Sequence, residues 1–156
     1  MLENLIQQQM DNIAFMQRTG IRAVEVTPGY GKSLMPLAGN ENHVGAMYMG
    51  ALSTLAEAGA AVAISTVLDF ERYFPVITRL DVEFLKPATT DVTAAYRLSE
   101  ETIAALHAEL DARGRCEYTA EVPMEDETGQ TVAVATVTVK VLSHQYQPQD
   151  TQDISA

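Results

Sequence analysis

Glu57 is the residue whose type and setting most clearly suggest chemistry. It is the only charged residue between His43 and Asp69, in a segment made mostly of alanine, glycine, serine, threonine and apolar residues. A buried carboxylate is costly unless it is paired or protonated, so we expect the pKa of Glu57 to be raised. Such a group can act as a general base or a nucleophile near neutral pH. The alternative is that Glu57 lies on an exposed or interface strip of its helix and only forms a salt bridge.

The start of the same segment offers hydrogen-bond donors for a developing negative charge. Gly50 lies seven residues before Glu57 and Thr54 lies three before it, which places all three on one face of a helix. The first N–H groups of that helix, near Met47–Gly50, lack partners within the helix and carry the positive end of its dipole. A substrate carbonyl held there would be polarised, as in an oxyanion hole. Alternatively, Gly50 and Gly59 serve only close packing against a sheet.

Two polar residues, Asn42 and His43, stand just before this helix. Asn42 could cap the helix, hold a water molecule or donate to a substrate carbonyl, and His43 could simply be solvated. No cluster of His, Cys, Asp and Glu has metal-ligand spacing, so we predict no metal. Neither a glycine-rich phosphate loop nor a Gly-x-Ser-x-Gly elbow is present. Cys116 falls on an apolar strand face and is expected to be an inert core thiol.

The element that must position these residues is the longest apolar stretch of the chain, Ala46–Leu68. As one helix it would be roughly 33 Å long, with small residues on nearly all sides. We reject a membrane span, because Glu57 in the middle would be expensive in lipid. A helix of this composition is instead wrapped closely by protein all round.

Alternation and helical spacing predict the remaining elements. An amphipathic helix over residues 2–17 ends near Gly20, and a second helix follows the N-cap Ser99 and ends at Gly114. Strands are expected at 22–26, 30–35, 76–84, 92–98, 116–124 and 131–142, the last two as an antiparallel hairpin. In the strand at 76–84 the apolar face is expected to consist of Val76, Leu80, Val82 and Phe84.

These elements add up to an α+β domain, in which a curved antiparallel sheet of five to six strands wraps one long central helix. Such a sheet leaves an edge strand that invites pairing with a second copy. We therefore expect a homodimer, with a dimer of dimers (a homotetramer) as a further possibility.

Composition narrows the class of partner and the compartment. The formal net charge of −11 argues against nucleic-acid and anionic-membrane partners, which need clustered Lys and Arg. A single cysteine fits a reducing compartment, and the first residues lack the pattern of a secretory signal, so we expect a cytoplasmic protein. One domain is expected over residues 1–146, followed by a disordered polar tail at 147–156.

Two segments resemble a known family. The run from Asn42-His43-Val44-Gly45 to Gly50-Ala51-Leu52-Ser53-Thr54-Leu55-Ala56-Glu57-Ala58 resembles the helix signature of the phenylacetate-pathway (PaaI-like) and 4-hydroxybenzoyl-CoA thioesterases. Asp81-Val82-Glu83-Phe84-Leu85-Lys86-Pro87-Ala88, followed by Asp91, resembles a strand of the same superfamily. The similarity covers about residues 20–142 and implies the hotdog fold. Tyr48 stands where the family has a histidine and Met49 replaces a glycine, which is typical of a divergent branch.

The resemblance also implies roles for residues. Glu57 falls at the catalytic carboxylate, Asn42 at the amide that holds the thioester or the attacking water, and Met49 and Gly50 at the backbone donors that polarise the carbonyl. We expect Tyr48, His43 and Thr54 to line the substrate-binding part of the site. Such sites lie at a dimer interface in this superfamily.

The expected function is therefore hydrolysis of an acyl-CoA thioester, with coenzyme A as part of the substrate and no separate cofactor. The alternative is an acyl-CoA or lipid-binding module without catalysis, which Tyr48 in place of the histidine favours. A hotdog dehydratase is a third reading, which the missing histidine weakens.

Overall fold

The structure, a computed structural model, describes residues 1–146 and contains four helices and six strands in that range. The predicted disorder at 147–156 lies outside the described residues. In chain order the elements are α1 (Leu2–Asp11), α2 (Ala14–Thr19), β1 (Arg22–Thr27), β2 (Tyr30–Met35), α3 (Met49–Ser65), β3 (Tyr73–Phe84), β4 (Val92–Arg97), α4 (Glu100–Arg113), β5 (Arg115–Asp126) and β6 (Thr131–Ser143).

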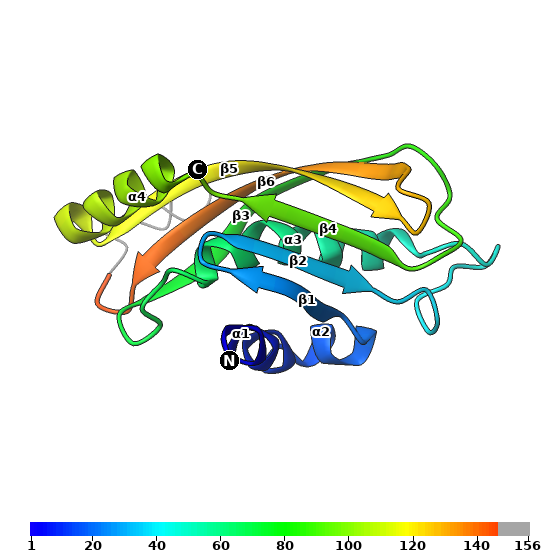
Figure 1. The fold of residues 1–156 in the computed structure, drawn as a ribbon, viewed down its shortest axis with the longest axis horizontal. Helices are drawn as coiled ribbons and strands as arrows, with labels where there is room; N and C mark the ends of the chain where they lie inside the picture. The colour runs from blue at the N-terminus through cyan, green and yellow to red at the C-terminus, as the bar shows by residue number, and fades with distance from the viewer. Residues whose placement is uncertain (147–156) are drawn as a thin grey trace.

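The six strands form one antiparallel sheet in the order β1-β2-β4-β5-β6-β3. The sheet curves around α3, which contacts β2, β3, β4, β5 and β6 (Figure 1). The helices α1 and α2 lie beside β1, and α4 lies beside the start of β5 (Figure 1). The predicted α+β arrangement, a central helix wrapped by a curved antiparallel sheet, is confirmed.

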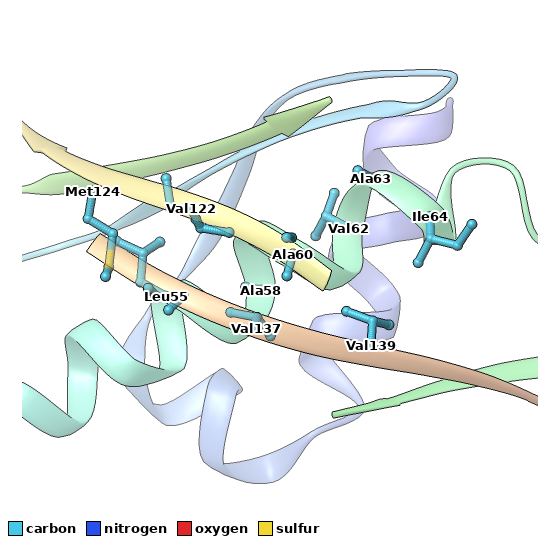
Figure 2. Close-up of a cluster of buried hydrophobic side chains, with 14 of the residues drawn as sticks. Leu55, Ala58, Ala60, Val62, Ala63, Ile64, Val122, Met124, Val137 and Val139 are labelled. Atoms are coloured by element: carbon cyan, nitrogen blue, oxygen red, sulfur yellow. The ribbon is translucent and has the colours of Figure 1, made fainter. Parts of the chain in front are cut away.

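The core lies between α3 and the middle of the sheet (Figure 2). Small residues on α3 allow strands to approach it on several sides, as its composition predicted. At Gly59 an added Cβ would lie only 2.9 Å from Val122 and 3.1 Å from Ala94, so this glycine serves close packing. The buried side chains drawn in Figure 2 include Leu55, Ala58, Ala60, Val62, Ala63 and Ile64 of α3 and Val122, Met124, Val137 and Val139 of the sheet.

The central helix is shorter than its apolar sequence predicted. It has 17 residues, about 25 Å in length, instead of extending over 46–68. Before it, the backbone N–H of Met47 donates to the carbonyl of Ala88 (2.8 Å), and Tyr48 is extended. After it, Thr66 accepts a hydrogen bond from the N–H of Gly29 (2.7 Å). Both flanks are held by tertiary contacts, and no helix within residues 1–146 is long and apolar enough to cross a membrane.

The predicted single helix over residues 2–17 is wrong in one respect, because the chain breaks it into α1 and α2. Ile13 adopts an extended conformation between them, with φ −92° and ψ 101°. Met10 before the break and Met16 after it are both buried. The break therefore lets two short helices turn their apolar sides toward the same region of the core, which hydrophobic spacing by itself does not reveal.

The two edges of the sheet differ in how they are covered. At β1, the Gln7 side chain of α1 bonds the strand backbone, with Nε2 donating to the carbonyl of Ile21 (3.2 Å) and Oε1 accepting from the N–H of Ala23 (2.8 Å). At β3, only β6 is a strand partner among the described residues. At the β1 edge, the Gln7 side chain thus takes two of the hydrogen bonds that a neighbouring strand would make, whereas the β3 edge is open to pairing.

The expected apolar face of β3 is only partly buried. A register shift between Ile77 and Arg79 interrupts the alternation. Leu80 and Phe84 are 40% and 41% exposed, which corrects the prediction that they face the core. The open edge of the sheet therefore carries large apolar side chains.

The other predicted strands and the helix after Ser99 form close to their expected bounds. The Ser99 hydroxyl accepts the N–H of Thr102 (3.0 Å), and Gly114 ends α4 in the left-handed conformation with φ 68°. Both helix signals in the sequence were therefore interpreted correctly.

Candidate functional site

The start of α3 presents two backbone donors without partners. Tyr48 caps the helix with no side-chain hydrogen bond, while its carbonyl accepts from Ala51 and Leu52. Among residues 1–146, no acceptor is bonded to the N–H of Met49 or of Gly50. Free amides at a helix N-terminus, together with the positive end of the dipole, suit a carbonyl oxygen that gains negative charge.

A cavity of about 500 Å³ opens beside Met49, whereas Gly50 does not line it. We call it the helix-start cavity, and four of the predicted site residues line it, namely Asn42, His43, Tyr48 and Met49. Its opposite wall comes from the end of β3 and the chain that follows, Phe84–Ala88. The hydrogen bond from Met47 to Ala88 ties these two walls together. The structure thus brings the two family-like segments, far apart in sequence, to one place.

Asn42 shapes the loop that borders the helix-start cavity. Its Oδ1 accepts from the N–H groups of Val44 (3.0 Å) and Ala46 (3.1 Å), so the side chain closes a turn and does not cap α3. The side-chain NH₂ has no partner among the described residues. One end of the amide therefore holds the loop, while the other is available to a substrate carbonyl or a water molecule.

Glu57 faces a second cavity, of about 470 Å³, which we call the Glu57 cavity. It lies between α3, the N-terminal helices and β3. Its lining comprises Ile6, Gln9, Met10, Ile13, Met16, Glu57, Ala58, Ala61, Val62, Ser65, Pro75, Val76 and Ile77. The predicted catalytic carboxylate is therefore neither in bulk solvent nor sealed in the core, but lines an apolar cleft.

The carboxylate of Glu57 is half-buried and forms no hydrogen bond or ion pair with any residue in the range 1–146. Burial raises its pKa, because the apolar surroundings disfavour the charged form and no cation compensates. Within residues 1–146, the salt bridge of the alternative interpretation does not form. An uncompensated carboxylate in a cleft is typical of a group kept for chemistry.

Gly50 and Thr54 have local roles in α3. The ring of Tyr48 lies against the position that a Cβ on Gly50 would take, so glycine leaves room for this ring. The hydroxyl of Thr54 donates to the carbonyl of Gly50 (2.8 Å), and its side chain is buried. Thr54 lies outside the lining of both cavities, so the structure does not bring it to the predicted substrate-binding part.

Glu57 and the free amides lie too far apart to act on one carbonyl within a single chain. Eight residues separate Met49 from Glu57, which corresponds to about 12 Å along the helix axis. Reacting groups must approach to about 3 Å of the atoms they act on. Each chain therefore carries a carboxylate in a cleft and free amides at a helix start, but the carboxylate and the Met49 amide lie at two different cavities.

Sequence reasoning did not assign Lys86 or the apolar side chains around Glu57 to a site. Lys86 lines the helix-start cavity, and its Nζ donates to Gln130 Oε1 (3.0 Å). Met10, Ile13 and Met16 belong to the amphipathic helix predicted over residues 2–17, but helical spacing does not reveal what its apolar face packs against. Only the packing of α1 and α2 against α3 shows that these side chains surround Glu57.

Cys116 is buried, and burial raises the pKa of its thiol to about 11. A thiol that stays protonated is a poor nucleophile, which agrees with the predicted inert role. Within the described range, no group of three or more His, Cys, Asp and Glu residues is arranged to hold a metal ion.

Comparisons with known proteins identify related folds. The family described as "domain of unknown function (DUF4442)" matches residues 4–141. A comparison with curated proteins finds no similar sequence. A protein of unknown function from Pseudomonas aeruginosa, PA5026, described as a probable thioesterase, is 39% identical over 90% of this chain and 95% of its own, with a TM-score of 0.82.

Two more distant structures share the fold. A thioesterase from Haemophilus influenzae is 21% identical, with a TM-score of 0.70, over 94% of this chain and 95% of its own. A thioesterase from Staphylococcus aureus is 15% identical, with a TM-score of 0.68, over 83% of this chain and 98% of its own. The Staphylococcus enzyme was solved with alanine in place of a glutamine and, separately, in place of a glutamate fifteen positions later.

Proposed function

Because this chain belongs to the DUF4442 family, a divergent branch of the hotdog-fold thioesterase superfamily, we propose that it hydrolyses thioesters of the acyl-CoA type. The observation that carries the proposal is the pair of unsatisfied groups on α3. Glu57 is a half-buried carboxylate with no counter-ion in the part of the chain that the structure describes, and Met49 and Gly50 offer free amides at the helix start. A base or nucleophile and an oxyanion-binding site are what acyl transfer to water requires.

The reaction follows from these groups. The thioester carbonyl accepts hydrogen bonds from the amides of Met49 and Gly50, which polarise it. Glu57 then either removes a proton from water as the water attacks the carbonyl carbon, or attacks that carbon itself to form an acyl-Glu57 that water cleaves. In both routes the C–S bond breaks, and the products are a carboxylic acid and the thiol of coenzyme A. Asn42 donates from its free NH₂ to the carbonyl or the water.

We place the complete site between two copies of the chain. The open edge of β3 pairs with its own copy around a two-fold axis, because antiparallel pairing completes the hydrogen bonds of both strands. If the axis passes near Leu80, Val76 of one copy lies opposite Phe84 of the other. The Glu57 cavity of one copy, walled by Val76, then adjoins the helix-start cavity of the other, walled by Phe84. This arrangement removes the separation of about 12 Å between Glu57 and the amides.

Sequence spacing gives further support. Asn42 and Glu57 are fifteen residues apart, the same separation as the glutamine and glutamate replaced in the Staphylococcus thioesterase. Lys86 and His43 stand at the helix-start cavity, where a cation and an imidazole can contact the phosphates or the pantetheine of coenzyme A. Tyr48, which is exposed, adds a ring at the same mouth.

A panel of acyl-CoA thioesters with short, long, branched and aromatic acyl groups tests the function. We expect release of free thiol, detected with a thiol-reactive dye, from at least one class at a rate well above spontaneous hydrolysis. Saturable acyl-CoA binding without thiol release from any member would instead support the non-catalytic binding module, which Tyr48 in the place of the family's histidine favours. Hydration of an enoyl-CoA without thiol release would support a dehydratase.

Leu80→Lys is expected to convert the dimer to a monomer and to abolish most of the activity. The substitution places a charge in the middle of the open β3 edge, where a copy of the same charge would lie nearby in the dimer. Light scattering coupled to size exclusion measures the mass, and thiol release measures the activity.

The matched control for this variant is Val24→Lys. Val24 is a similarly exposed apolar residue on β1, the edge that α1 covers. The control is expected to keep the mass and activity of the wild type. A dimer that persists in Leu80→Lys, or dissociates equally in Val24→Lys, would contradict pairing through β3.

A further inference from the structure

The Glu57 cavity extends along α3 from the carboxylate toward the C-terminal end of the helix. Its α3 lining residues run from Glu57 to Ser65, eight residues or about 12 Å. An extended covalent chain advances roughly 1.2 Å per bond, a third of the rise of one extended residue, so about ten bonds fit this length. Along α3 the cavity is therefore about as long as a chain of ten bonds, with the acid near one end.

The wall of the Glu57 cavity is mostly hydrocarbon and thioether, and its polar side chains are Gln9, Glu57 and Ser65. The N-terminal helices contribute Ile6, Met10, Ile13 and Met16, while the sheet contributes Pro75, Val76 and Ile77. No Lys, Arg or His lines the cavity, so nothing in it compensates a phosphate or a second carboxylate. Methionine side chains adapt their shape to flexible apolar ligands.

The helix-start cavity is also lined mostly by apolar side chains, but it adds Lys86, His43 and the free amide of Met49. A thioester has one polar, anionic end and one acyl end, joined at the reacting carbonyl. Of the two cavities, only the helix-start cavity is lined by a lysine or arginine, Lys86, which orients the substrate with its coenzyme there and its acyl chain beyond Glu57.

We propose that the Glu57 cavity holds the acyl chain of the substrate, that this chain is linear and aliphatic with about ten carbon atoms, and that α1 and α2 form the wall that selects it. The proposal rests on the proposed thioester hydrolysis and adds the substrate class. Each methylene buried in such a wall raises kcat/KM by up to about fourfold, the equivalent of about 0.8 kcal/mol.

The test compares kcat/KM for straight-chain acyl-CoA substrates from butanoyl to hexadecanoyl. For the wild type we expect a rise from butanoyl to about decanoyl, followed by a plateau or a fall. Benzoyl-CoA and 4-hydroxybenzoyl-CoA are expected to react more slowly than decanoyl-CoA, because a rigid ring does not fill the length of the cavity.

Two variants change the cavity from opposite walls. Ala61→Leu adds three carbons one helical turn beyond Glu57, and the ratio of decanoyl to butanoyl kcat/KM is expected to fall by roughly tenfold or more. Ile13→Ala removes part of the α1–α2 wall, and the same ratio is expected to fall severalfold. The matched controls are Ala105→Leu on the exposed surface of α4 and Leu5→Ala on α1, both outside the cavity lining. The ratio should not change in either control.

The outcomes separate this proposal from the proposed function. Hydrolysis with no dependence on chain length, or with equal ratios in Ala61→Leu and Ala105→Leu, would overturn the acyl-chain assignment while leaving the enzyme intact. Activity without chain-length dependence is what we expect if side chains of a second copy occupy the Glu57 cavity. If no thioester is hydrolysed, the proposed function fails. Calorimetric measurement of decanoyl-CoA binding then tests whether the Glu57 cavity holds an acyl chain. Tight binding that Ala61→Leu weakens would support the assignment, and equal or absent binding would overturn it.

Discussion

Replacing Glu57 by glutamine is expected to lower kcat for the preferred thioester by about 10²–10⁴-fold, the range for loss of a positioned base. Glutamine keeps the size of the side chain but can neither accept a proton from water nor attack a carbonyl carbon. The change should appear in kcat more than in KM, because the carboxylate acts on the reacting atoms. The measurement is the initial rate of thiol release for wild type and variant under saturating substrate.

The matched control is Glu121→Gln, which removes the same charge from an exposed position on β5. It is expected to behave like the wild type. The wild-type rate should also fall on the acid side with a midpoint above the usual glutamate pKa of about 4.3, because burial raises the pKa of Glu57 and only the ionised form is active. A Glu57→Gln variant that retains full activity would exclude both versions of the mechanism.

The Glu57→Gln variant should be more stable than the wild type at neutral pH. The pKa of Glu57 is raised in the folded protein, so the folded state binds the proton more tightly than the unfolded chain does. The contribution of Glu57 to the free energy of unfolding is therefore present at low pH and is lost as the pH rises through the raised pKa. Glutamine carries no charge, so the melting temperature of Glu57→Gln should exceed that of the wild type at pH 7. The difference should narrow below about pH 4. Thermal unfolding at the two pH values measures it.

Met49→Pro is expected to lower kcat by about 10²–10³-fold, the usual loss of one oxyanion donor. Proline removes the N–H of Met49 and leaves the rest of the helix intact, because the first helical position tolerates proline. Tyr48 already has φ −63° and ψ 138°, the conformation favoured before a proline. Met49→Ala keeps the amide, so the ratio of the two variants isolates the contribution of the N–H group. Equal rates in both would remove this amide from the mechanism.

A mixed dimer of Glu57→Gln and Met49→Pro provides the sharpest test of a shared site. Chains with different affinity tags can be co-expressed and purified through both tags. If the amides and the carboxylate come from different copies, one of the two sites is intact, and about half of the wild-type activity should return. If each site lies within one chain, the mixed dimer should be as inactive as its parents.

Much of the fold was predictable because it depends on local patterns that the chain repeats. Residue alternation predicts β5 and β6, the Ser99 hydroxyl and Gly114 mark the ends of α4, and the small residues of α3 indicate a helix enclosed by a sheet. The break at Ile13 and the exposure of Leu80 were not predictable in this way. The break and the exposure both depend on which elements pack against these residues in the folded protein. Sequence spacing indicates only the face of a helix or strand on which a residue lies.

For the candidate site, the sequence by itself determined the chemistry available. Glu57 stands out as a lone acid in an apolar helix, and the positions of Asn42, Met49 and Gly50 follow from the family-like spacing. The tertiary structure decided how these groups are distributed. The Thr54 hydroxyl bonds within its own helix, and Glu57 has no partner among the described residues and lies about two turns of α3 from the helix start. The tertiary structure also brings Met10, Ile13 and Met16 around the acid. The reason is that the types of side chains set what reactions are possible, whereas distance and desolvation arise only when α1, α2 and β3 pack against α3.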